Sequence, residues 1–339
     1  MSSLIIISIF ILTITLILFI FYKKIALSKN FLDKPQIFSS HKSAVPTGAG
    51  IILIILILSF YFFLKSNLLI NLEKLYFPNR DYLLIFSVFI LGLINFYDDI
   101  KQTHPLYRLC AHFACVMLSL SLFSFINHDL YAIIPEKVFL IFLIFFWVYL
   151  INIFNFLDGS DGYLSINSIT CFLAFFLTSL HKEIFDFDFY LSLLLILILV
   201  IYLFFNFPKA KIFMGDSGSI TIGYLIGYFS FVLLFNGNWN IAFAIIFYPL
   251  LDVSLTIIRK VKNGYYPWER LFDYFFLRAL KGQNFNHKKI FFISLSYNLL
   301  NLLNIILMIN LNLKWLIIFT MVLGFLKIFL FNKLSRVNI

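Results

Sequence analysis

Five acidic side chains follow long apolar stretches of this 339-residue chain. The adjacent pair Asp98 and Asp99 closes the stretch LGLINFYDDIK, Asp158 and Asp161 follow in NIFNFLDGSDG, and Asp216 lies in KIFMGDSGS. Carboxylates are costly near a membrane, so their recurrence at such places indicates a task beyond solubility. Hard oxygen ligands of this kind suit magnesium, which keeps waters and phosphate oxygens in its shell. A magnesium ion could bridge and neutralise the phosphates of a lipid phosphate and a sugar nucleotide that react at the membrane surface.

The stretch 152–162 repeats polar side chains at every third position, as Asn152, Asn155, Asp158 and Asp161. In a helix this spacing places all four on one face, turned toward the interior of a bundle. The two glycines among them would end the helix and let the backbone approach a ligand. A single Asp after a span is equally well a helix cap, and a polar stripe can simply be wet helix packing. The adjacent acidic pair and the two glycine-flanked motifs favour phosphate and metal chemistry.

The composition identifies the elements that must position these groups. The chain is 62% hydrophobic and only 12% charged, whereas soluble domains carry about 25% charged residues. Such a chain cannot coat a water-facing surface, so soluble enzymes, coiled coils and disordered proteins are excluded. The 46 Phe residues stand mostly in long runs with Ile and Leu, unlike the short alternating segments of an outer-membrane barrel. The three Cys residues form no CxxC pair and indicate neither disulfides nor zinc.

The apolar runs predict an all-α, polytopic membrane bundle of ten or eleven transmembrane helices in one domain, 1–339. The expected spans are 4–22, 49–66, 81–97, 106–126, 138–155, 163–180, 189–206, 219–235, 240–258, 291–310 and 314–331. The acids then fall in loops on one face, and Asp252 lies about two turns inside the ninth span. The expected active-site loops are 23–48, 98–105, 156–162, 207–218 and 259–290.

The basic residues predict the orientation. With the N-terminus outside, twenty of the 26 Lys and Arg residues fall on the inner side and six on the outer side. Cytoplasmic loops carry such an excess of Lys and Arg. We therefore expect the acid-bearing loops and the C-terminus to lie on the cytoplasmic side of the membrane. The net charge of +10 then orients the chain and does not indicate nucleic acid. The outer six are Lys65, Lys74, Arg80, Lys137, Lys182 and Lys314.

Four motifs in order resemble the polyprenyl-phosphate N-acetylhexosamine-1-phosphate transferases of glycosyl transferase family 4, which include phospho-MurNAc-pentapeptide translocase. They are D-x-P…SSH…PTGAG at Asp33–Gly50, the pair Asp98-Asp99, N-x-x-N-x-x-D-G-x-D-G at Asn152–Gly162, and F-M-G-D-x-G-S at Phe213–Ser219. The sequence PLLD ending at Asp252, followed by Ile258-Arg259-Lys260, also resembles the ninth helix of that family.

The resemblance implies transfer of a sugar 1-phosphate from a UDP-sugar to undecaprenyl or another polyprenyl phosphate, with release of UMP. It implies a Mg²⁺ cofactor, for which Mn²⁺ can substitute, and an active site on the cytoplasmic face of a bacterial inner membrane. By it, Asp98 or Asp99 acts on the lipid phosphate, and Asp216, together with Asp99, ligates the metal. The residues Asn152, Asn155, Asp158 and Asp161 would line the uridine-diphosphate pocket, with Lys101 at a phosphate.

Two departures from that family pattern concern recognition. Phe38 stands where an Arg often precedes SSH, and segment 259–290 lacks the usual His cluster after an acid–Arg pair. Glu269-Arg270 is the nearest equivalent of that pair, and His287 is the only His in the segment. The departures favour a divergent branch that starts O-antigen or another surface polysaccharide. We expect Arg270 and His287 to help select the sugar, since the other motifs meet parts common to all UDP-sugars.

Three other interpretations stay open at this point. They are a phospho-MurNAc-pentapeptide translocase of peptidoglycan synthesis, an ion-coupled transporter, and a catalytically inactive scaffold, which only the missing His cluster supports. A transporter would place its carboxylates on broken helices near the bilayer midplane. The expected partners are the polyprenyl phosphate, the UDP-sugar and membrane lipids, without nucleic acid, and a homodimer is left open.

Overall fold

The computed structural model describes residues 2–35, 39–66, 79–121, 123, 135–267, 269, 271 and 273–336. Within these ranges the chain is a helical bundle with one two-stranded antiparallel ribbon, β1 Leu32–Asp33 and β2 Val45–Pro46. A single 3₁₀ turn, Lys314–Leu316, precedes the last helix. The helices are α1 Ser2–Ser28, α2 Gly50–Lys65, α3 Asn79–Lys101, α4 Pro105–Leu120, α5 Glu136–Leu157, α6 Tyr163–His181, α7 Phe187–Asn206, α8 Gly215–Phe235, α9 Trp239–Lys262, α10 Phe275–Gly282, α11 His287–Leu311 and α12 Ile317–Ser335.

The predicted all-α membrane bundle is confirmed. Among the described residues, nine helices are long and apolar enough to cross a membrane. Two shorter apolar helices, α2 and α4, end beside residues that the structure does not describe. Together these eleven helices overlap the eleven spans that the hydropathy predicts. The short helix α10 lies in the segment between the ninth and tenth spans, where no span is expected.

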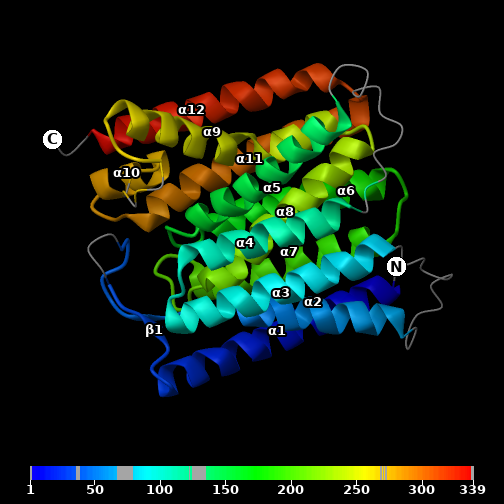
Figure 1. Ribbon diagram of the computed structural model, residues 1–339, viewed down its shortest axis with the longest axis horizontal. Helices are drawn as coiled ribbons and strands as arrows, with labels where there is room; N and C mark the ends of the chain where they lie inside the picture. Colours follow the sequence, from blue (N-terminus) through cyan, green and yellow to red (C-terminus); the bar gives the residue numbers. More distant parts are fainter. Residues whose placement is uncertain are drawn as a thin grey trace.

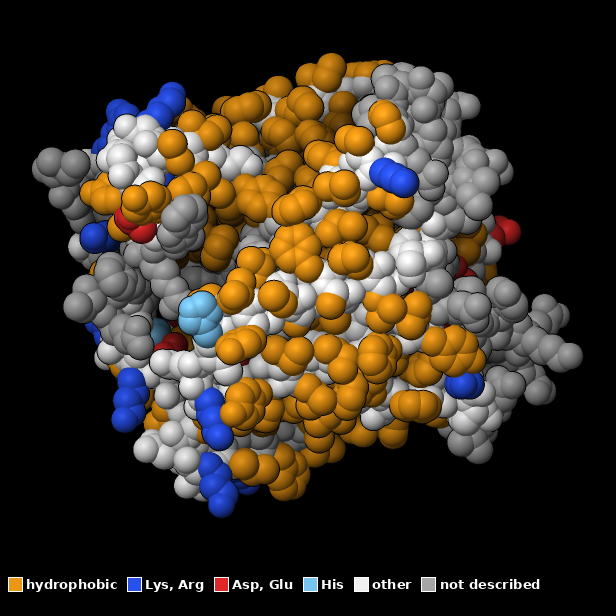
Figure 2. Space-filling view, viewed as in Figure 1, with side chains coloured by type: hydrophobic (Ala, Val, Ile, Leu, Met, Phe, Trp, Pro, Cys, Tyr) orange, Lys and Arg blue, Asp and Glu red, His pale blue; other side chains and the backbone are white. Residues whose placement is uncertain are grey.

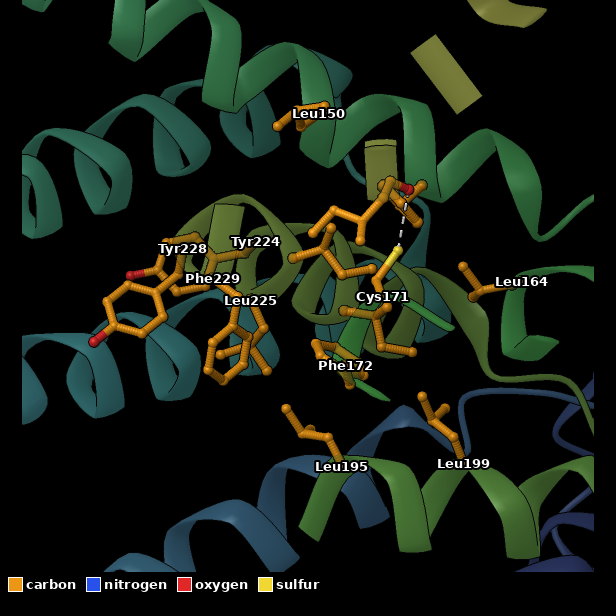
Figure 3. Packing of buried hydrophobic residues seen from close by; sticks show 14 of the residues in the cluster. Leu150, Leu164, Cys171, Phe172, Leu195, Leu199, Tyr224, Leu225, Tyr228 and Phe229 are labelled. Atoms are coloured by element: carbon orange, nitrogen blue, oxygen red, sulfur yellow. Dashed lines mark hydrogen bonds between the residues drawn. The ribbon is translucent and has the colours of Figure 1, made fainter. Parts of the chain in front are cut away.

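Helix α8 forms the centre of the bundle. In its most apolar stretch 89% of the residues are buried, against 17% for α1 and 22% for α12. It packs against α2, α3, α5, α6 and α9 (Figure 1). Figure 3 shows Phe229 of α8 beside Phe172 of α6, with ring centroids 5.7 Å apart, and Leu195 of α7 nearby. Because α8 begins at Gly215, one residue before Asp216, this central position fixes that carboxylate in the fold.

The outer surface is apolar around the middle of the molecule and charged at its ends. Large exposed hydrophobic side chains cover α1, α11 and α12, as expected for faces in contact with lipid tails. Figure 2 shows this apolar band, with most of the visible Lys and Arg side chains at the end that carries β1 in Figure 1. The two termini lie at opposite ends of the bundle (Figure 1), as an odd number of spans requires.

One basic residue does not lie where the charge count placed it. Lys327 was counted with the inner C-terminal residues, but it lies within α12 and is 2% exposed. Its ammonium group faces the rings of Tyr248, Tyr297 and Tyr163. Without Lys327, the inner side keeps nineteen of its twenty basic residues, so the charge argument for the orientation is little changed.

Candidate active site

The ribbon formed by β1 and β2 joins the first loop to the segment before α8. The Phe213 N–H donates to the Pro46 carbonyl at 2.7 Å, and the Gly50 N–H donates to the Met214 carbonyl at 2.8 Å. Helices α2 and α8 then start so close together that a Cβ on Gly50 would lie 2.1 Å from the Gly218 nitrogen. Only glycine fits this approach. The PTGAG and GDSGS motifs are therefore two halves of one packed junction.

The two carboxylates that end α3 have different partners. Asp99 accepts hydrogen bonds from the first N–H groups of α8, at 2.8 Å from Asp216 and 3.2 Å from Ser217, and from the Ser217 hydroxyl at 2.7 Å. Its charge thus caps the positive end of the α8 dipole. Asp98 instead accepts from the N–H and hydroxyl of Thr103, each at 2.6 Å. The α3–α4 turn therefore holds Asp98, whereas α8 holds Asp99.

Arg108 joins Asp98 to Asp216. One turn into α4, its Nη1 donates to Asp98 Oδ2 at 2.7 Å and also contacts Asp216 Oδ2. The arginine side chain is 14% exposed, Asp98 10% and Asp216 33%, so the more open side of this cluster is that of Asp216. A guanidinium cation therefore lies between two carboxylates that come from residues more than a hundred positions apart. The sequence analysis counted Arg108 only as an inner basic residue and missed this position.

The repeated polar residues lie partly on α5 and partly in the turn that follows it. Asn152 donates to the Val148 carbonyl of its own helix, and Asn155 Oδ1 accepts from the Ser219 hydroxyl at 2.7 Å. The helix ends at Leu157 with Asp158 as its C-cap. The single helical stripe expected from the spacing therefore stops after Asn155, and the two acids lie in the turn.

Gly162 and Asn206 shape that turn. Gly162 has a φ of 70°, a left-handed conformation that glycine adopts without strain, and its N–H donates to Asn206 Oδ1 at 2.7 Å. The Asn206 amide donates in turn to the Ile212 carbonyl, and Asp161 Oδ2 accepts from the Ala210 N–H at 3.0 Å. The 158–162 turn is thereby fastened to the loop before α8. The sequence analysis missed Asn206, whose only signal is a polar amide at the end of an apolar run.

His287, the first residue of α11, links two loops. Its Nδ1 accepts from the Asp161 N–H at 3.3 Å and lies 3.1 Å from the Ser160 hydroxyl, while its Nε2 lies 3.0 Å from the Ser40 carbonyl. Since a carbonyl can only accept, this arrangement requires the proton on Nε2. Both ring nitrogens of His287 are therefore engaged by the protein itself. The other predicted selectivity residue, Arg270, lies outside the described residues.

Helix α10 lies within segment 259–290, where the resemblance leads one to expect a His cluster. Phe276 stacks on Tyr163 with centroids 4.2 Å apart, and Tyr274 stacks on Phe156 at 5.2 Å. The first N–H of the helix, that of Phe275, donates to the buried Asp252 at 2.9 Å. An apolar helix face thus packs directly on the turn that carries Asp158 and Asp161.

Glu269 and Lys101, which the sequence singled out, each contact a residue of their own segment of the chain. Glu269 accepts from the Tyr266 N–H at 3.3 Å, and Asp273 takes the ion pairs, with Arg259 at 3.0 Å and Arg278 at 3.8 Å. Lys101 is exposed, with its ammonium group over the Tyr97 ring at 5.2 Å. The Phe38 departure lies outside the described residues.

Asp158 experiences the field of this acidic cluster. Burial raises its pKa well above the usual range, and the carboxylates of Asp216, Asp99, Asp161 and Asp33 raise it further. Burial also raises the pKa of Asp33, against the opposing effect of His41 3.8 Å away. Acids far apart in the sequence therefore lie close enough to interact at one end of the bundle.

The donor set fits a divalent ion that takes part of its shell from a substrate. Within the described ranges no three His, Cys, Asp or Glu side chains surround one point. Magnesium in phosphate-transfer sites is held by one or two carboxylates plus phosphates and waters, so it does not need three such side chains. Asp98 and Asp216 already share one cation, the Arg108 guanidinium, which marks where positive charge is accommodated.

Sequence comparisons give relatives of known name. Residues 82–234 match the model of glycosyl transferase family 4. The undecaprenyl-phosphate alpha-N-acetylglucosaminyl 1-phosphate transferase of Thermotoga maritima is 28% identical over 270 residues, which are 79% of this chain and 78% of that protein.

Two further relatives match over shorter stretches. The phospho-N-acetylmuramoyl-pentapeptide-transferase of Leuconostoc citreum is 32% identical over 118 residues, 33% of each chain. A probable undecaprenyl-phosphate N-acetylglucosaminyl 1-phosphate transferase of Bacillus subtilis is 41% identical over 66 residues, 18% of each chain. These two matches therefore cover a third or less of each relative.

Proposed function

This chain belongs to glycosyl transferase family 4, and from that premise we propose that it transfers a hexosamine 1-phosphate to a polyprenyl phosphate in the membrane. The donor is a UDP-sugar, of which UDP-N-acetylhexosamines are the first candidates. A phosphate oxygen of the lipid attacks the phosphorus that carries the sugar. The bond from that phosphorus to the bridging oxygen breaks, and UMP leaves.

The observation that carries this proposal is the convergence of Asp98, Asp99 and Asp216 with the 158–162 turn at one end of the bundle. A lipid phosphate lies at the membrane surface and a sugar nucleotide comes from water, so the two meet at this level. The polar ends of α5, α8 and α4 meet there as well, whereas a transporter would place its carboxylates near the midplane.

We assign separate tasks to the two acids of α3 from their different hydrogen-bond partners. Both oxygens of Asp99 accept from the start of α8, so this residue positions Asp216. Asp98 lies at the shared cation, so we assign it to the lipid phosphate and to the ion beside Asp216. A divalent ion held by Asp216, with Asp98 or Asp99 beside it, would supply charge neutralisation for the phosphates. Fixed groups that face developing charge contribute strongly to such reactions.

The turn and α5 supply the nucleotide side of the site. Asp158 accepts no side-chain hydrogen bond from the described residues and stays available to a ligand. Asn152, partly exposed, lies one turn before Asn155 on the same helix. We propose that Asn152, Asn155 and Asp158 bind the uridine diphosphate. Asp161 is already bound to the Ala210 N–H and shapes the pocket from the side.

The test is incubation of the purified protein with undecaprenyl phosphate and a panel of UDP-sugars, with and without Mg²⁺. We expect UMP release with one sugar of the panel, dependence on a divalent cation and loss of release with EDTA. UDP-MurNAc-pentapeptide belongs in the panel because of the Leuconostoc relative, and its use would assign the chain to peptidoglycan synthesis rather than to O-antigen or another surface polysaccharide. Absence of UMP release with every sugar would contradict the proposal.

A further inference from the structure

The positive charge of Arg108 lies between the two carboxylates that we propose for the metal and phosphate site. Its Nη1 contacts both Asp98 Oδ2 and Asp216 Oδ2, and the side chain is 14% exposed. Two carboxylates that lie this close repel each other unless a cation stands between them. The chain therefore carries its own cation at the point where the proposed divalent ion would bind.

The carboxylate oxygens available to an incoming ion are limited. Asp98 Oδ1 is held by two donors of Thr103, and both Asp99 oxygens are held by the start of α8. Asp98 Oδ2 and Asp216 Oδ2 are bound by Arg108. An ion that binds between these two oxygens takes the position of the guanidinium. A displaced guanidinium keeps its charge and its N–H donors, and phosphate is the anion that matches them.

We propose that Arg108 is a competing internal cation: it holds Asp98 and Asp216 together before substrate arrives, yields them to the divalent ion, and then binds a phosphate of the substrate. The first half, competition between Arg108 and the divalent ion, concerns only the metal and this chain. The second half, binding of a substrate phosphate by Arg108, rests on the proposed function. Arg108 is thus assigned to substrate binding as well as to the order of the unliganded site.

The first test measures Mn²⁺ binding without substrate, by electron paramagnetic resonance on protein in lipid nanodiscs. Arg108→Gln removes the competing charge, so Mn²⁺ should bind about tenfold more tightly than to the wild type. Lys333→Gln removes an exposed positive charge from the last turn of α12, outside the candidate site, and should leave the affinity unchanged. The tighter binding should vanish when Asp216→Asn is added to Arg108→Gln. Equal or weaker Mn²⁺ binding by Arg108→Gln would overturn the proposal.

A second measurement uses the wild type and does not depend on the folding of a variant. Coupling between two binding events is reciprocal. If the Arg108 ion pairs weaken Mn²⁺ binding, bound Mn²⁺ must weaken those ion pairs by the same factor. Phenylglyoxal, an arginine reagent, should modify Arg108 severalfold faster when Mn²⁺ is present, as read by mass spectrometry of the peptides. Arg259, which is paired with Asp273, serves as the internal reference. It should react at the same rate with and without Mn²⁺. An unchanged rate at Arg108 would contradict the competition.

Turnover separates the second half from the first. Arg108→Gln should bind Mn²⁺ more tightly and yet lose turnover by about tenfold or more, with a raised KM for the phosphate substrate, as expected when one charged phosphate contact is lost. Tighter metal binding with normal turnover would refute the phosphate role while leaving the competition standing. If the wild type releases no UMP at all, the proposed function fails, but the Mn²⁺ measurements still decide the competition.

Discussion

At the scale of single residues, the candidate site contains acids that a short stretch of sequence reveals and partners that it does not. Acidic type and glycine flanks pointed to Asp98, Asp99 and Asp216 because these features can be seen in one short window. The partners of those acids cannot be seen there. Arg108 stands in an ordinary apolar helix, and Asn206 ends an ordinary span; each acquires a role only when distant segments meet. Side-chain identity therefore indicates candidate ligands, but it does not indicate which distant residues hold those side chains in place.

Asp216 should be needed for activity and not for folding. Asp216→Asn keeps the shape and the neighbouring α8 cap, which is made by backbone N–H groups and Asp99, but it removes the charge that a divalent ion needs. We expect a loss of turnover of roughly a hundredfold or more, with a normal elution profile in detergent. Glu183→Gln, the same change at an exposed site at the other end, is the control and should turn over normally. Normal rates for Asp216→Asn would refute the metal role.

His287 should hold the Ser160–Asp161 turn in position rather than select the sugar. Its two ring nitrogens bind the Ser40 loop and the Ser160–Asp161 turn, so it has no nitrogen left for substrate. His287→Ala should lower turnover with every accepted UDP-sugar by a similar factor, about tenfold to a hundredfold, because a small misplacement of the turn is costly. Lys288→Ala, the exposed neighbour, should turn over normally. A changed ratio of rates between two sugars would instead support the selective role first expected from sequence.

At the scale of elements, the spans were predictable and the segment after α9 was not. Each span is a run of apolar residues long enough to cross a bilayer, which is a local property of the sequence. Helix α10 has only eight residues and depends on contacts that come from α5, α6, α9 and α12. The sequence indicated a basic recognition loop in 259–290. In the fold, part of that segment is a helix whose aromatic face covers the active-site turn.

Tyr248 connects the two buried charges beneath α10. Its hydroxyl donates to Asp252 Oδ2 at 2.8 Å, and its ring faces the Lys327 ammonium group at 3.6 Å. Asp252 and Lys327 are 1% and 2% exposed, and Lys327 Nζ has no hydrogen-bond partner among the described residues. A buried acidic and a buried basic side chain therefore both contact the same tyrosine.

This pair should show a rescue that only paired charges give. Asp252→Asn or Lys327→Met alone leaves one buried charge without its partner, and each should cost about 3–5 kcal/mol of stability. The double variant removes both charges and should recover most of that loss. Thermal unfolding in detergent, followed by tryptophan fluorescence, measures the three variants against the wild type. If the two losses simply add in the double variant, the charges are not coupled.

At the scale of the whole molecule, charge and hydropathy together predict a direction across the membrane. The fold brings the loops rich in Lys and Arg to one end, where the acids also lie, and the correction at Lys327 removes only one of twenty inner charges. Which end faces the cytoplasm follows from the positive-inside rule and not from packing, since the bundle would be equally stable either way up. The orientation therefore stays a prediction that needs its own experiment.

Fusions to a phosphatase that is active only outside the cytoplasm measure that orientation. A fusion after Lys262 should be silent, because α9 then delivers the phosphatase to the inner side, and a fusion near Asn71, between α2 and α3, should be active. A cytosolic reporter at the same two points should give the reverse pattern and serves as the control for expression. UDP-sugars are made in the cytoplasm, so the proposed reaction also requires the end that carries Asp98 and Asp216 to face that side. An active phosphatase after Lys262 would place the acids outside, and the proposed reaction would fail together with the topology.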